Sequence, residues 1–88
     1  MWGDRDMRLK NKTIYFKSSE PFFTKEMKGI KNNTVRTLDS KEGMLLLEYH
    51  IEDIKHICIE SVETRLFFVR TIKDISFYAD RWIFTWEG

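Results

Sequence analysis

The sequence predicts one small α+β domain: five or six mostly antiparallel strands that curl into a sheet or barrel, with one or two helices. Its 88 residues suit a single hydrophobic core. Hydrophobic residues make up 42% of the chain and aromatic residues 15%, which supplies the large side chains that a small core needs. The second half alternates apolar and polar residues in short runs, a pattern typical of strands.

The chain is predicted to start with a polar tail, followed by a strand. Residues 1–11 are rich in charge and have no clean period, so they are assigned to an N-terminal tail that precedes a single domain over residues 12–88. In residues 12–17, Ile14 and Phe16 fall on one face of an extended chain. This alternation predicts the first strand.

A helix is predicted over residues 21–28. Ser18 and Ser19 offer an N-cap, Pro21 suits the first turn, and Gly29 suits the end of the helix. Residues spaced four and three apart form an apolar side that is expected to pack against the sheet: Phe23, Met27 and Ile30.

Residues 34–38 are predicted to form a short strand, and residues 39–54 favour a second helix. Asp39 and Glu42 have the spacing of a capping box. A buried strand over residues 44–47 is the alternative. Four apolar residues repeat at helical spacing and support the helix: Met44, Leu47, Ile51 and Ile54.

From His56 onward the pattern predicts strands over residues 56–60, 66–70, 75–79 and 82–86. Turns are expected near residues 63–64 and 79–81. Ile83 and Phe84 point to opposite faces, so one of them is expected outside the main core. The core candidates are Phe16, Phe23, Met27, Val35, Leu47, Ile57, Ile59, Phe68, Ile75, Phe77, Ile83 and Phe84.

Charge and cysteine content restrict the classes of function. Fifteen Lys and Arg against fourteen Asp and Glu leave a net charge of +1, so any nucleic-acid contact must come from a local patch or pocket. Cys58 has no second cysteine to pair with, and no apolar run resembles a signal peptide or a membrane span, which favours the cytoplasm and no membrane partner. His50, His56 and Cys58 lack the spacing of a metal site, so neither a metal nor a cofactor is expected.

The segment from Gly29 to Arg36 contains the strongest candidate site. Thr34 and Arg36 share one face of a strand, and Lys31 lies just before it. An ammonium, a hydroxyl and a guanidinium in one place can hold an anion or the edge of a base. The alternative is a solvated loop in which Arg36 pairs with a carboxylate such as Glu60, or extends over apolar surface.

The order strand, helix, then G-x-K-x-x-T-x-R resembles the signature of ASCH domains, a branch of the PUA-like β-barrels. The matching residues are Gly29, Lys31, Thr34 and Arg36. The resemblance covers roughly residues 12–38, and the chain looks like the very short members found in phages and prophages. It implies a small barrel beside a helix, with a cleft where related domains bind RNA or modified bases.

The resemblance also implies a possible chemistry. Some ASCH-like enzymes are amidohydrolases that act on acylated cytidine, and by that likeness Thr34 would be the nucleophile and Lys31 would activate or stabilise. Their catalytic Glu has no counterpart here. Glu48, Glu60 and Glu63 are candidates by residue type only, which favours binding over hydrolysis.

Three functions follow, and the first is preferred. It is a binding domain for a nucleobase, nucleotide or single-stranded RNA, in which Lys31, Thr34 and Arg36 contact the ligand and an aromatic side chain stacks on it. The aromatic candidates are Tyr78, Tyr15 and Trp82. The second is a phage-type protein that binds and modulates a host protein, and the third is the amidohydrolase. The sequence does not indicate an oligomeric state.

Overall fold

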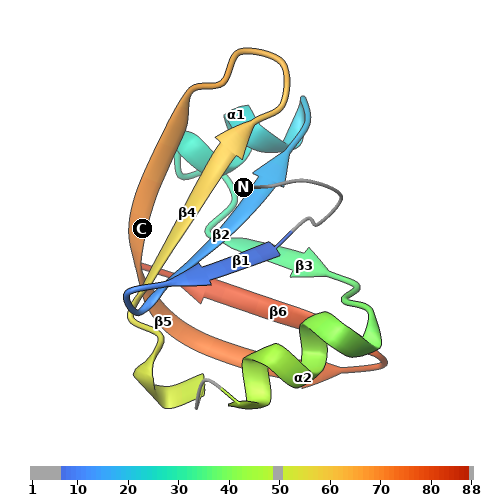
Figure 1. Cartoon of the computed structure of the whole chain (residues 1–88). Coiled ribbons are helices and arrows are strands. Elements are labelled where there is room, and N and C mark those ends of the chain that lie inside the picture. Colours follow the sequence, from blue (N-terminus) through green and yellow to red (C-terminus); the bar gives the residue numbers. More distant parts are fainter. Residues whose placement is uncertain (1–6, 49–50, 88) are drawn as a thin grey trace.

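The computed structural model describes residues 7–48 and 51–87, except for the side chain of Leu47 (Figure 1). Six strands form one mixed sheet in the order β1-β2-β4-β5-β6-β3. The strands are β1 (Met7–Lys10), β2 (Thr13–Ser18), β3 (Asn33–Arg36), β4 (His56–Ser61), β5 (Phe67–Tyr78) and β6 (Arg81–Trp86). The helices are α1 (Phe22–Met27), α2 (Ser40–Glu48) and a short 3-10 helix η1 (Ile51–Asp53).

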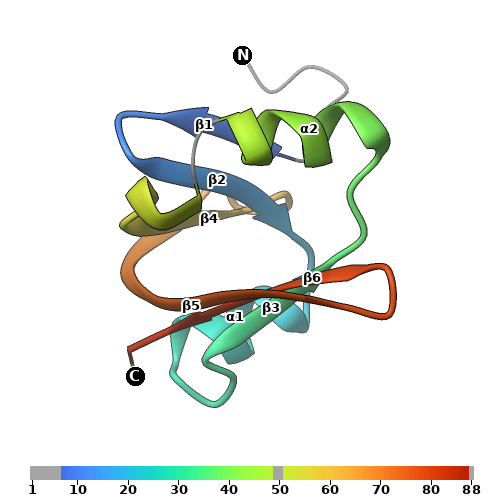
Figure 2. The ribbon, with the colours of Figure 1, turned by 90° about the horizontal axis from the view of Figure 1, so that it is seen from below.

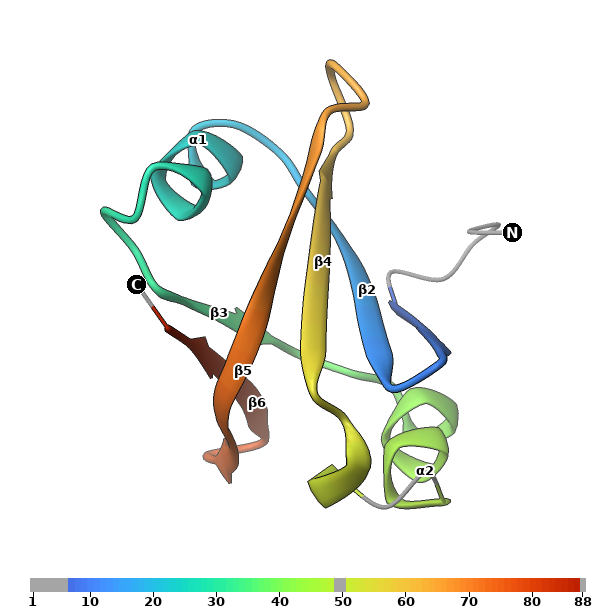
Figure 3. The same ribbon diagram turned by 90° about the vertical axis from the view of Figure 1, so that its left-hand side faces the viewer.

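This architecture confirms the predicted α+β class and the mostly antiparallel sheet. Among the described strands, only β2 and β4 pair in parallel. The sheet curls so that its β1-β2-β4 half faces its β5-β6-β3 half (Figure 2), and α1 and α2 lie at opposite ends (Figure 3). The described strands form an open curled sheet with β1 and β3 as its edges, not a closed barrel.

The long strand β5 joins the two halves of the sheet. Its first part pairs with β4 as far as Thr71, and its second part pairs with β6 from Ile72 onward. The register is irregular between Ile72 and Asp74, which is where a strand can bend. Two separate strands were predicted over this range, and the structure has one. The predicted turn that follows is confirmed, with Ala79 and Asp80 at φ values of 51° and 62°.

Part of the predicted tail belongs to the sheet. Residues 7–10 form β1, which pairs with β2 and places Met7 opposite Phe16. Met7 is fully buried. Met7 and Leu9 alternate with Arg8 and Lys10, but a run of four residues is too short for the alternation to stand out among the charged residues around it. Residues 1–6 of the predicted tail lie outside the described residues.

The core lies between the two halves of the sheet. The predicted core residues that are buried are Phe16, Phe23, Ile57, Ile59, Phe68 and Phe84. Met27 and Ile75 are partly buried against them, and Ile83 is half-buried beside the fully buried Phe84, as expected for residues on opposite faces. The core also contains Met7, Ile14, Leu46, Ile54 and Trp86.

Two core predictions are wrong, and Leu47 is not among the described side chains. Val35 is exposed because the neighbouring Thr34 takes the inward position on β3. Phe77 is exposed because it lies near the β5–β6 turn, beyond the core, where its ring packs 5.0 Å from that of Trp82.

The helices bury some of the apolar residues that were predicted to pack against the sheet. Phe23 on α1 is buried, but Ile30 is 73% exposed because the helix ends before Gly29, whose φ is 79°. The capping box of α2 is present: the Glu42 N–H donates to Asp39 Oδ1 (2.8 Å), and the Asp39 N–H donates to Glu42 Oε1 (3.2 Å).

The apolar face of α2 is rotated from the predicted one. Met44 is exposed, and Leu46 is fully buried in its place. Ile51 belongs to η1 and is half-buried, while Ile54 is buried just beyond it. The predicted apolar face, from Met44 to Ile54, would need a helix that continues through residue 54, and α2 is described only as far as Glu48.

Candidate functional site

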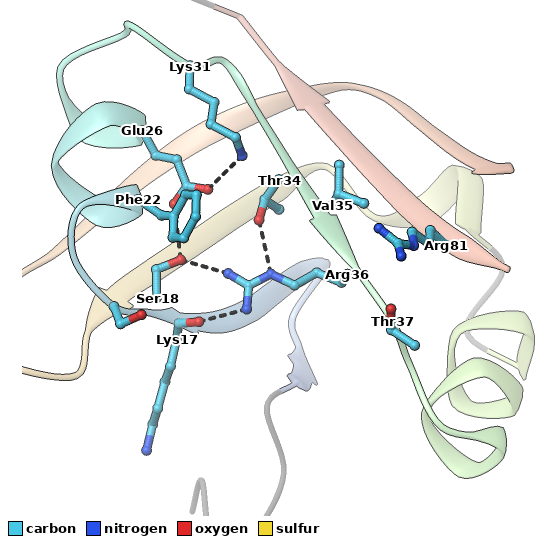
Figure 4. Close-up of a pocket in the computed structure, with 11 residues that line it drawn as sticks. Lys17, Ser18, Phe22, Glu26, Lys31, Thr34, Val35, Arg36, Thr37 and Arg81 are labelled. Carbon is cyan, nitrogen blue, oxygen red and sulfur yellow. Dashed lines mark hydrogen bonds and ion pairs between the residues drawn. The ribbon is translucent and has the colours of Figure 1, made fainter. Parts of the chain in front are cut away.

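The predicted site residues line one pocket. Lys31, Thr34 and Arg36 all border a hollow of about 470 Å³ between α1, the end of β2 and β3 (Figure 4). This volume is within the range of small-molecule sites. The structure therefore brings together the three polar residues that the sequence placed in one segment.

The end of α1 positions Lys31. Gly29 turns the chain back with a positive φ, which favours glycine, and Lys31 then reaches over the helix. Its Nζ donates to Glu26 Oε2 at 3.2 Å and to the carbonyl oxygen of Asn33 at 2.7 Å. These are the two bonds that Lys31 Nζ makes among the described residues. Because an ammonium has three N–H donors, one donor remains for a ligand.

Glu26 is a site residue that the sequence reasoning missed. Its side chain is 1% exposed, and its Oε1 accepts a hydrogen bond of 3.0 Å from the Ser18 hydroxyl. A buried carboxylate requires such partners, and Lys31 supplies the opposite charge. One signal was available: Glu26 is three residues after Phe23, so the two residues lie on the same, buried face of the helix.

Arg36 ties β3 to the end of β2. Its Nε donates to Thr34 Oγ1 (3.0 Å), its Nη1 to the carbonyl of Lys17 (2.7 Å), and its Nη2 to Ser18 Oγ (2.8 Å). The guanidinium also lies 4.6 Å from the ring centre of Phe16. These contacts make Arg36 a residue that positions the pocket wall.

The two expectations for Arg36 are only partly met. It does line the same pocket as Lys31, as the binding hypothesis expects. However, three of its N–H groups bond to protein oxygens and hold the wall in place. Glu60, the carboxylate named in the alternative, forms an ion pair with Arg65 at 3.2 Å.

The pocket lining is electropositive. Among the described residues, the lining includes the cationic residues Lys31, Arg36 and Arg81 and the carboxylate Glu26. Lys17 also lines the hollow, but its ammonium points away from these residues (Figure 4). Charges of one sign that line a hollow attract ligands of the opposite sign. The near-neutral chain therefore has the local positive patch that nucleic-acid or nucleotide binding would require.

Among the described residues that line the pocket, the aromatic one is Phe22, which is 53% exposed. Tyr78 is 76% exposed near the β5–β6 turn, and it is not among the described residues that line the pocket. Trp82 packs against Phe77. Phe22 could have been found from the sequence, because Phe23 next to it takes the core position and leaves Phe22 outside.

A second hollow of about 400 Å³ lies on the outer face of β2, β4 and β5. Tyr15, Phe67 and Val69 line it, and Tyr15 stacks with Arg8 at 4.9 Å. Cys58 is buried, and it lines this outer hollow. Burial raises the pKa of the Cys58 thiol, the charge of Glu60 raises it further, and Arg8 opposes both.

Metal and membrane sites are not found in the described part of the chain. Residues 7–48 and 51–87 contain no group of three His, Cys, Asp or Glu side chains placed to hold a metal ion. His56 is exposed, and His50 lies outside the described residues. Within the same ranges, no helix has the length and apolar character needed to cross a membrane.

Comparisons with known proteins returned no match among protein-family models, curated proteins or solved structures. The likeness to ASCH domains therefore remains an expectation based on Gly29, Lys31, Thr34 and Arg36.

Proposed function

We propose that the chain is a small ASCH/PUA-like binding domain that holds a nucleobase, nucleotide or single-stranded RNA in the pocket between α1, β2 and β3. One observation carries this proposal. Lys31, Thr34 and Arg36 line one pocket, where Lys31 bonds to buried Glu26, and Arg36 bonds to buried Ser18 and to the Thr34 hydroxyl oxygen. Pre-organised polar groups lose little freedom when a ligand binds.

The chemistry of the lining fits a nucleotide better than a neutral molecule. Lys31 presents a donor to a phosphate or a base oxygen, and Arg81 adds positive charge at the rim. Phe22 offers an exposed ring on which a base can stack. Such binding should weaken as the salt concentration rises, because the cations release counterions from the ligand.

The test is NMR titration of the labelled protein with uridine monophosphate and with a short uridine-rich RNA. Shifts should cluster at residues 31–36 and 22. Phe22→Ala should weaken the affinity about tenfold, since stacking on one aromatic ring contributes ~1–3 kcal/mol. Phe67→Ala removes an exposed ring in the second hollow and should leave the affinity unchanged.

A charge pair gives a second comparison. Arg81→Gln removes a cation from the pocket rim and should weaken binding, while Arg65→Gln removes an exposed arginine next to Glu60 and should have no effect. If neither ligand at millimolar concentration shifts the signals of residues 31–36, the proposed function is wrong.

Hydrolysis of an acylated nucleobase is a second candidate, favoured by the position of Glu26. The sequence offered Glu48, Glu60 and Glu63 as catalytic carboxylates by residue type only, whereas Glu26 Oε2 lies 3.2 Å from Lys31 Nζ in the same pocket as Thr34. In that case Thr34 Oγ1 would attack the amide carbonyl and form an acyl ester, while the C–N bond breaks and the hydroxyl proton passes to the departing N4 amine of cytidine. Water would then hydrolyse the ester, which releases acetate and restores the Thr34 hydroxyl. Wild-type protein should then release cytidine from N4-acetylcytidine, Thr34→Val should abolish the release, and the exposed Thr37→Val should retain it. No turnover by the wild type excludes this candidate.

A further inference from the structure

Strand β3 is an edge of the sheet, and its register shows which backbone groups are directed away from β6. The Trp86 N–H donates to the carbonyl oxygen of Asn32 at 3.0 Å, so these two residues form a hydrogen-bonded pair. The register continues with Thr34 opposite Phe84 and Val35 opposite Ile83. Hydrogen-bonded and non-hydrogen-bonded pairs alternate along an antiparallel ladder.

This alternation assigns the direction of each residue on β3. Thr34 and Arg36 turn their backbone N–H and C=O groups toward β6, whereas Asn33 and Val35 turn theirs toward the open edge. The bond from Lys31 Nζ to the Asn33 carbonyl oxygen supports this assignment, because it places that carbonyl on the side away from β6.

The open edge of β3 borders the pocket. Residues 34–37 all line it, although their side chains alternate between the two faces of the strand. Consecutive residues can line one hollow when the hollow runs along the strand edge, where the backbone itself is accessible. Val35 therefore presents one backbone donor and one backbone acceptor beside the cations of the pocket.

We propose that the Val35 N–H and C=O groups bind the edge of a nucleobase held in the pocket; this inference rests on the proposed function. The N–H and C=O of one extended residue point the same way, as they do when two strands exchange a pair of hydrogen bonds. A Watson–Crick edge offers the matching pair. In uracil the N3–H donates to the Val35 carbonyl, and the adjacent carbonyl oxygen accepts from the Val35 N–H.

The local geometry favours a base over an added peptide strand. A peptide that extended the sheet would pair with several outward groups of β3, and the Asn33 carbonyl is already bonded to Lys31. β3 has only four residues, so Val35 supplies the main outward donor and acceptor pair. One such pair suffices for a base, and the surrounding cations suit the phosphate of a nucleotide.

The test compares two ligands and two variants. Wild-type protein should bind uridine monophosphate about tenfold more tightly than its 3-methyluridine analogue, which lacks the N3–H donor. Val35→Pro removes the backbone N–H from the protein side, and proline is tolerated where the N–H of an edge strand points outward. It should weaken uridine monophosphate binding about tenfold, while Val35→Thr, which keeps the N–H, should not.

The outcomes separate this inference from the proposed function. Equal affinity of the wild type for both nucleotides overturns the assignment of Val35 and leaves the pocket as the binding site. Loss of the folded far-UV spectrum in Val35→Pro also overturns it, since the N–H would then be needed by β6. If no nucleotide binds and an extended acidic peptide shifts Val35 instead, both proposals fail.

Discussion

Replacement of Glu26 by glutamine tests the polar network that holds the pocket together. The carboxylate accepts one hydrogen bond from Ser18 and one from the Lys31 ammonium. Glutamine keeps the shape of the side chain but has one acceptor oxygen and one donor nitrogen. One of the two donors, Ser18 or Lys31, must then face the amide N–H₂ group, and the buried site loses its negative charge.

The size of the effect follows from burial. A hydrogen bond to a charged group contributes ~1.5–3 kcal/mol, and breaking a fully buried ion pair costs about 3–5 kcal/mol. Glu26 is 1% exposed, but the Lys31 side chain is 29% exposed, so water partly compensates the cation. We therefore expect Glu26→Gln to lower the free energy of unfolding by about 2 kcal/mol. For a domain of this length, that corresponds to a fall in Tm of about 8–16 °C.

Thermal and urea unfolding followed by circular dichroism measure this change. Glu20→Gln is the matched control, because Glu20 precedes α1, is exposed, and bonds to Thr24 through the same kind of carboxylate. Its cost should stay within about 0.5 kcal/mol. The double variant Glu26→Gln with Lys31→Met should be more stable than the sum of the single changes predicts, because the two partners interact directly.

Two results would refute this reasoning. A Glu26→Gln protein as stable as the Glu20→Gln control would mean that the carboxylate is solvated or uncharged in the native protein. Strict additivity in the double variant would mean that the 3.2 Å contact with Lys31 contributes nothing to stability.

Three further predictions concern other parts of the fold. Phe23→Ala should cost about 3–5 kcal/mol, measured by urea unfolding, since its buried ring packs 5.6 Å from that of Phe68; a near-neutral result would mean that α1 does not dock through this residue. Arg36→Lys should lower the unfolding free energy by about 1–3 kcal/mol because one ammonium cannot reproduce three diverging bonds, and unchanged stability would contradict the role assigned to Arg36. The pKa of the Cys58 thiol is raised in the folded state, so the folded protein favours the neutral thiol. The resulting contribution to the free energy of unfolding is fully present below the ordinary thiol pKa, and it is lost as the pH rises through the raised pKa. Alkylation of Cys58 by iodoacetamide should accordingly be slow at neutral pH and faster in Glu60→Gln, and an equal rate in both proteins would contradict the electrostatic cause.

Local signals in the sequence predicted local structure well. The pair Asp39 and Glu42 predicted a capping box because its two bonds join residues three apart. Likewise, the alternation around Ile14 and Phe16 predicted a strand with one buried face. In both cases the sequence pattern and the contacts that it predicts lie within the same few residues of the chain.

Contacts between distant segments were not accessible in the same way. β2 pairs in parallel with β4, and β5 pairs first with β4 and then with β6. Both features depend on how the whole sheet curls. The site shows the same division. Lys31, Thr34 and Arg36 could be singled out from one short segment, whereas Ser18 gains its role only when the end of β2 meets α1 and β3.

The position of β3 in the sheet sets an order of assembly for the pocket. Most of its lining residues lie between positions 17 and 37, yet β3 finds its strand partner in β6, which is synthesised much later. A nascent chain on the ribosome therefore carries Lys31, Thr34 and Arg36 before it has the strand that holds them in place. Ligand capture should begin only after residues 81–86 emerge, so that binding reports completion of the fold.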